Sequence, residues 1–95
     1  MLSINPFDLE KSNSADMEKQ ILRAGLISEL DAINLFEQLA SLSKDEKAKT
    51  ILRNITREKK EHVGELETLL LRSDKEQMEG LAEGTKELEK LDENR

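Results

Sequence analysis

Apolar residues recur along most of this chain at spacings of three and four, which is the period of an amphipathic α-helix. Between residues 16 and 42 one stripe reads Leu22, Leu26, Glu29, Ile33, Phe36 and Ala40. Between residues 44 and 72 a second stripe reads Ala48, Leu52, Ile55, Lys59, His62, Leu66 and Leu69. The sequence shows no alternating pattern typical of β-strands. The pattern therefore predicts an all-α chain with two long helices.

Capping residues divide the chain further. Ser43 and Glu46 have the spacing of a capping box, and Ser73 and Glu76 repeat it. The first pair predicts the start of the second helix, and the second pair predicts a weaker third helix that contains two glycines. We expect one domain over residues 1–95, with a leader at 1–15 and helices at 16–42, 44–72 and 74–91.

The leader contains a further helix-start signal. Asn5 before Pro6 is typical of an N-cap followed by proline at the first helical position, which predicts one or two turns over residues 6–11. The polar segment that follows ends at Asn13 or Ser14, and either residue is expected to cap the first long helix.

Both apolar stripes are interrupted at their centres by ionisable residues. Glu29 interrupts the first stripe, and Lys59 and His62 interrupt the second. Antiparallel packing through the short turn at Ser43 would bring these three residues to one level of a helical hairpin. Burying an unpaired charge costs several kcal/mol, so these groups must pair with each other, bind a cation or face water.

A single hairpin would leave apolar surface uncovered. Ile21, Ile27, Leu30 and Leu39 stand beside the first stripe, and two hairpins that pair into a four-helix bundle would cover such surface. The composition agrees, because the chain has only two Phe, no Trp and no Tyr, and 38% of its residues are charged. A chain this short buries only about 60% of its surface on folding. The sequence therefore predicts a homodimer as the folded unit.

Charge and cysteine content exclude several classes of function. The chain has no Cys, so it has no disulfide framework, no zinc knuckle and no thiol nucleophile, and we expect a reducing, cytoplasmic environment. A net charge of −6 disfavours binding to nucleic acid and attracts cations. No apolar run approaches the roughly 20 residues that cross a bilayer, which argues against a membrane protein.

Carboxylates and a histidine from facing helices are the ligands with which helical bundles hold iron or manganese. The usual helical unit is Glu-x-x-His, but here Lys59 stands three residues before His62. Glu58 precedes His62 by four residues and Glu65 follows it by three, so both share its side of the helix. Two arrangements stay open. Lys59 either points inward and pairs with Glu29 in place of a metal, or points outward while Glu58 or Glu65 completes a metal site.

The segments SELDAINLFEQLA (28–40) and REKKEHVGELETLLLRSDKEQ (57–77), with MLSINP at the start, resemble the encapsulated ferritin-like proteins. The resemblance is greatest to the ferritin-like domain that precedes the shell protein in archaeal encapsulins. It implies a two-helix chain that dimerises into a ferritin-like four-helix bundle with a di-iron ferroxidase site at the dimer interface. It also implies a ring-like oligomer such as a decamer, housed in an encapsulin nanocompartment or fused to its shell.

The resemblance assigns roles to individual residues. By that resemblance Glu29 is the metal ligand of the first helix, His62 is the metal-binding histidine, and Asp31 is an acid on the path by which metal reaches the site. The second-helix glutamate of the family falls on Lys59, so this chain departs from the family pattern at a metal ligand.

Three functions follow from these observations. The first is a ferroxidase that oxidises Fe(II) with O₂, with Glu29 and His62 as catalytic ligands. The second is a metal-free assembly or cargo domain of an encapsulin system. The third is a helical adaptor that buries its apolar stripe against an unrelated partner helix.

Overall fold

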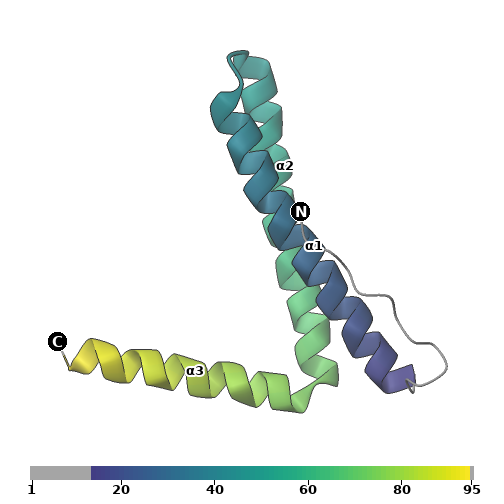
Figure 1. Ribbon diagram of the computed structural model, residues 1–95, viewed down its shortest axis with the longest axis vertical. Helices are drawn as coiled ribbons and strands as arrows, with labels where there is room; N and C mark the ends of the chain where they lie inside the picture. Colours follow the sequence, from purple (N-terminus) through teal and green to yellow (C-terminus); the bar gives the residue numbers. More distant parts are fainter. Residues whose placement is uncertain (1–13, 95) are drawn as a thin grey trace.

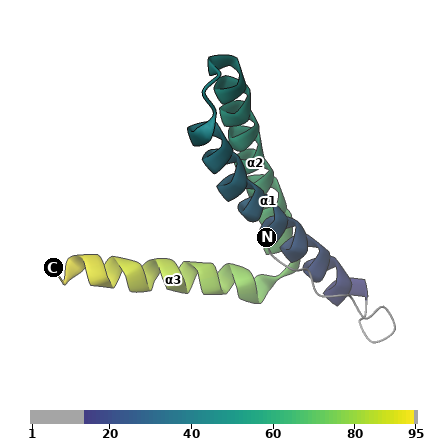
Figure 2. The same ribbon diagram turned by 45° about the horizontal axis from the view of Figure 1, so that its top comes forward.

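The computed structural model describes residues 14–94, which form three α-helices and no β-strand. The helices are α1 (Ser14–Leu42), α2 (Glu46–Ser73) and α3 (Lys75–Glu93). α1 and α2 pack side by side as an antiparallel hairpin, and α3 leaves the far end of α2 at a steep angle, so the molecule has the shape of an L (Figures 1 and 2). The predicted all-α class and the hairpin are thus confirmed. The turns expected at residues 6–11 and the candidate cap Asn13 lie outside the described residues.

Two predicted helix starts were wrong. α2 is capped by Asp45, whose carboxylate accepts a hydrogen bond from the Ala48 amide at 3.3 Å, and not by Ser43. α3 is capped by Asp74, and the hydroxyl of Ser73 donates back to the Leu69 carbonyl at 2.9 Å. Each helix therefore begins one or two residues later than expected, because an aspartate one or two positions after the predicted serine supplies the capping oxygen.

The hydrophobic core between α1 and α2 is thin. Among the described residues, the buried apolar side chains are Ile33, Ala40 and Leu70. Thr56 is also buried, and its hydroxyl donates to the Leu52 carbonyl at 2.9 Å, which satisfies it within its own helix. The hairpin is therefore held by a narrow strip of small and medium side chains.

The orientation of α2 differs from the predicted one. The side of α2 that faces α1 passes through Thr56, Val63 and Leu70, whereas Leu69 is 48% exposed. Apolar residues stand at both 69 and 70, so the spacing of three and four fits either rotation of the helix, and packing against α1 selects one. As a result His62, seven residues before Leu69, lies on a lateral face of the hairpin.

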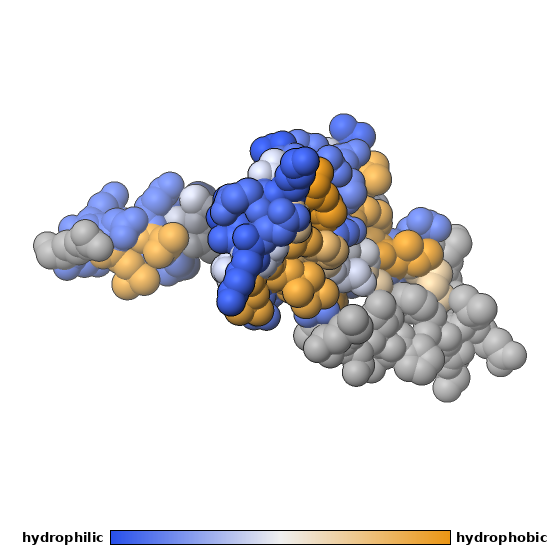
Figure 3. Space-filling view, turned by 90° about the horizontal axis from the view of Figure 1, so that it is seen from above, coloured by the Kyte–Doolittle hydropathy of each residue, from blue (hydrophilic) through white to orange (hydrophobic). Residues whose placement is uncertain are grey.

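We call this lateral surface the site face. It lies on one side of the buried strip between α1 and α2, and helical periodicity shows which residues of each helix lie there. These residues are Ile21, Phe36, Leu39, Ile51, Ile55, His62 and Leu69. Four of its apolar side chains are 40–57% exposed. Figure 3 shows apolar surface among the charged residues of the hairpin and again on α3. None of the helices within residues 14–94 combines the length and the apolar character needed to span a membrane.

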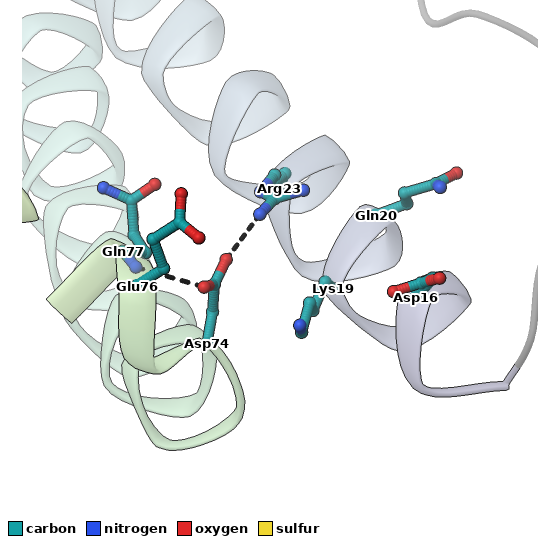
Figure 4. Close-up of a pocket in the computed structure, with 7 residues that line it drawn as sticks. All are labelled: Asp16, Lys19, Gln20, Arg23, Asp74, Glu76 and Gln77. Carbon is teal, nitrogen blue, oxygen red and sulfur yellow. Dashed lines mark hydrogen bonds and ion pairs between the residues drawn. The ribbon is translucent and has the colours of Figure 1, made fainter.

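The junction between the hairpin and α3 is organised by Asp74. Its carboxylate accepts a hydrogen bond from the Gln77 amide at 3.1 Å and forms an ion pair with the Arg23 guanidinium of α1 (Figure 4). The Asp74 amide donates to the Leu70 carbonyl of α2 at 2.8 Å. Asp74 is only 6% exposed, and it therefore joins all three helices at one point.

Hydrogen bonding and charge keep Asp74 ionised. The hydrogen bond from the Gln77 amide is the largest effect, and it lowers the pKa of Asp74 below its ordinary value of 3.8. The hydrogen bond from Arg23 and the positive charges of Lys19 and Arg23 act in the same direction, while desolvation of the carboxylate acts against them.

Candidate functional site

Three ionisable residues meet at the middle of the hairpin. The Glu29 carboxylate of α1 lies between two side chains of α2, with its Oε2 atom 3.2 Å from His62 Nδ1 and 3.7 Å from Lys59 Nζ. These residues are the ones that interrupt the apolar stripes, and antiparallel packing places them at the same level. They form a layer of one acid, one base and one imidazole.

The layer is only partly shielded from water in the single chain. The side chains of Glu29 and Lys59 are each 22% exposed, and that of His62 is 50% exposed. Lys59 Nζ also lies 5.7 Å from the centroid of the Phe36 ring, which is within the range of a cation–π contact. Lys59 therefore points into the hairpin, held by a carboxylate on one side and an aromatic ring on the other.

The other predicted site residues stand apart from this layer. Glu58 and Glu65 are exposed, and Asp31 is half-buried. Glu65 lines a shallow groove on the outer side of α2 together with Glu61, Thr68 and Arg72. In the described part of the chain, no three His, Asp or Glu side chains come together in a way that would hold a metal ion.

The donor set of one chain does not fit an iron site. Glu29 and His62 offer one carboxylate and one imidazole, and the Lys59 ammonium already neutralises that carboxylate. Pairing two chains across the site face would bring together two carboxylates and two ammonium groups, whose charges cancel. Such a layer provides no net negative charge to attract two divalent cations.

Sequence reasoning missed two contacts that shape this region. The Phe36 ring was expected only as a core residue, and its contact with Lys59 was not foreseen. The pair of Arg23 and Asp74 joins residues 51 positions apart, and nothing in the local pattern of either segment signals it.

Comparisons with known proteins agree with this architecture. A solved structure, the encapsulated ferritin domain from Pyrococcus furiosus, superimposes on the chain with a TM-score of 0.82 and 45% sequence identity, covering 96% of this chain and 95% of the other. A curated relative, the ferritin-like-encapsulin shell fusion protein of Pyrococcus furiosus, is 46% identical over 93 residues. No protein-family model matches the chain.

The fold and the ionisable layer define a ferritin-like helical hairpin. Because the match to the solved domain has 45% sequence identity and covers nearly the whole of both chains, this chain belongs to the encapsulated ferritin-like domains. The chain spans only 27% of the length of the curated fusion protein, although the match covers 96% of the chain itself.

Proposed function

We propose that this chain is a dimeric ferritin-like domain that works with an encapsulin shell, and that the pair of Lys59 and Glu29 replaces its iron site. The observation that carries the proposal is the position of the Lys59 ammonium, 3.7 Å from the carboxylate expected to bind metal. The amine supplies, next to this carboxylate, the positive charge that a cation would otherwise supply.

The exposed apolar residues of the site face support the dimer. Leu39, Ile51 and Leu69 are 40%, 57% and 48% exposed in the single chain, and they flank the ionisable layer. Two site faces packed together would exclude water from these side chains and from both Glu29–Lys59 pairs. Dimerisation thus completes both the core and the charged layer.

Association with a shell is supported by the relative from Pyrococcus furiosus, in which a ferritin-like region and an encapsulin shell form one protein. We propose that this domain is likewise held in an encapsulin nanocompartment of the cytoplasm, as a ring-like assembly such as a decamer. In this function the domain is a structural or cargo component and carries out no metal chemistry.

Ferroxidase activity is the second candidate, and the contact of Glu29 with His62 at 3.2 Å favours it. These are the two residues that resemble the family's metal ligands, and the fold places them side by side. Iron binding would then require Lys59 to leave Glu29, and it would require Glu58 or Glu65, which lie apart from the layer, to turn inward.

Iron loading under anaerobic conditions, followed by addition of O₂, separates the two candidates. We expect the purified chain to retain no iron after gel filtration and to oxidise Fe(II) no faster than buffer. The Lys59→Glu variant restores the acid expected at this position, and it should retain about two irons per dimer, the number that two-metal helical bundles hold. Lys59→Met is the matched control, because it removes the charge without adding a ligand.

The outcome that contradicts the metal-free function is stoichiometric iron and rapid ferric absorbance in the unmodified chain. Metal analysis by mass spectrometry and absorbance in the near ultraviolet report binding and oxidation separately, so iron that is bound without being oxidised would also be recognised.

A further inference from the structure

A second apolar surface lies on the other side of the buried strip from the site face, in the inner angle of the L (Figure 1). It is a groove of about 490 Å³ to which all three helices contribute. Three of its large side chains, Ile27, Leu30 and Leu81, are 42%, 52% and 43% exposed. Its apolar lining consists of Leu26, Ile27, Leu30, Val63, Leu70, Leu71 and Leu81.

The polar residues that line the groove are few, and most of their hydrogen-bonding capacity is already used. They are Arg23, Glu67 and Gln77. The Arg23 guanidinium pairs with Asp74, and the Gln77 backbone amide donates to the same carboxylate. A groove with so apolar a lining suits a large apolar side chain better than a charged ligand.

The chain carries such side chains in residues 1–13, which lead directly into α1 at Ser14. We call these residues the leader. Its large apolar residues are Leu2, Ile4, Phe7 and Leu9. Phe7 is one of two aromatic residues in the whole chain, and an aromatic ring gains more than most side chains from removal from water.

The leader is long enough to reach the groove of its own chain. Phe7 precedes Ser14 by seven residues, so the backbone can carry it up to about 24 Å from the start of α1. Leu26 follows Ser14 by 12 residues, which places it about 18 Å along the helix. Leu9 can reach about 17 Å, close to the same level.

We propose that the leader folds back along α1 of its own chain and inserts Phe7 into this groove. Phe7 then covers Leu30 and Leu81, and Leu9 lies closer to the start of α1. The short connection favours the groove of the same chain over that of another molecule, because it holds Phe7 nearby at a high effective concentration.

Insertion of the leader would tie the hairpin to α3 through an apolar contact, in addition to the ion pair at Asp74. The inference goes beyond the proposed function, and it involves none of the residues of the ionisable layer. It therefore stands or falls independently of whether the chain binds iron.

Fluorescence of a single tryptophan tests the contact, because the chain has no Trp and no Tyr. We expect Phe7→Trp to emit at a shorter wavelength than a peptide of residues 1–13 with the same substitution. Acrylamide should quench the protein at least about threefold less than the peptide, since the groove excludes water and solutes. Emission and quenching equal to those of the peptide would overturn the proposal.

A charge in the groove provides the specific control. Leu30→Glu, added to Phe7→Trp, should return emission and quenching to the values of the peptide, because an apolar ring no longer gains from binding there. Leu35→Glu is the matched control, since Leu35 is 46% exposed on the same helix but does not line the groove. It should change neither value, and circular dichroism verifies that both variants fold. Equal effects of the two glutamates would refute the assignment.

Co-refolding of two variants distinguishes the chain's own groove from that of a second copy. The chain with Phe7→Trp and Leu30→Glu is unfolded and refolded with an excess of Phe7→Ala chain, whose groove is intact. The tryptophan should stay accessible to acrylamide, because its own groove is blocked. Recovery of protection would show that the leader binds another copy, which would contradict the proposal.

Discussion

Asp74 illustrates how a single carboxylate positions an entire helix. It caps α3 through the Gln77 amide and binds Arg23 of α1, and it is almost fully shielded from solvent. The remaining ion pairs of α3 lie within the helix itself, among the residues that the structure describes. Among the described residues, Asp74 therefore makes the ion pair that links the start of α3 to α1.

We predict that α3 loses its fixed direction at acidic pH. The pKa of Asp74 is lowered by folding, so its contribution to stability is fully present above the ordinary value of 3.8. That contribution is lost as the pH falls through 3.8 toward the lowered pKa. Spin labels on Glu46→Cys and Lys86→Cys, diluted with unlabelled chain, should give one narrow distance at neutral pH and a broad distribution in strong acid.

Substitutions at the same junction provide the controls. Asp74→Ala removes both the cap and the ion pair and should broaden the distance distribution at every pH. Asp74→Asn keeps a capping oxygen but loses the charge, so it should have a smaller effect. If Arg23→Gln and Asp74→Ala both leave the distribution narrow, Asp74 does not set the direction of α3.

The sequence could predict which ionisable side chains come together where their positions depend on the helical period. The periodicity placed Glu29, Lys59 and His62 at one level. In the structure, the Lys59 ammonium and a ring nitrogen of His62 each lie within 4 Å of the Glu29 carboxylate. The capping residues could not be chosen in the same way. Serine and aspartate side chains can both cap a helix. Here Asp45 accepts from the Ala48 amide while the Ser43 hydroxyl donates to the Asp45 carbonyl, and this choice depends on where the turn places each side chain.

At the scale of the helices, glycine positions separate exposed surface from contact surface. A Cβ atom at Gly64 of α2 would have no neighbour within 4 Å, whereas a Cβ atom at Gly25 of α1 would lie 3.3 Å from Leu66 Cδ1. Gly25 thus allows α1 to approach α2 closely, and Gly64 only weakens its helix.

We predict that Gly64→Ala increases the free energy of unfolding by about 0.5–1 kcal/mol, because alanine restricts the unfolded chain and favours the helix. Gly25→Ala should show a smaller gain or a loss, since Leu66 must move to accept the new methyl group. Urea unfolding followed by circular dichroism at 222 nm measures both variants. A larger gain at Gly25 than at Gly64 would contradict this account of the helix contact.

The sequence predicts the helix α2 but not which of its faces packs against α1. Consecutive leucines at 69–71 make several faces of its last turns apolar, so periodicity alone does not decide which leucine is buried. Burial of Leu70 and Thr56 follows from contact with α1, and it moves His62 from the predicted centre to the edge of the hairpin. That shift places His62 on the surface that a second copy would cover.

At the scale of the whole molecule, the proposed four-helix dimer would form through the site face. We predict that Leu39→Glu weakens dimerisation at least about tenfold, because the new carboxylate would be buried without a partner. Analytical ultracentrifugation over a range of concentrations measures the dissociation constant. Met78→Glu is the control, since Met78 is similarly exposed but lies on α3. Equal effects of the two variants would show that the dimer does not form through the site face.

The sequence by itself determined the helical class, the hairpin and the three ionisable residues that meet at its centre, because these follow from local periodicity. The composition also predicts a partner, because so few large apolar side chains favour a core that a second chain completes, and this stays a prediction. Only the tertiary structure decided that Lys59 points inward onto Glu29, that His62 stands at the edge, and that Asp74 and Arg23 orient α3. Those outcomes depend on helix rotation and on contacts between distant segments, which a periodic pattern does not encode.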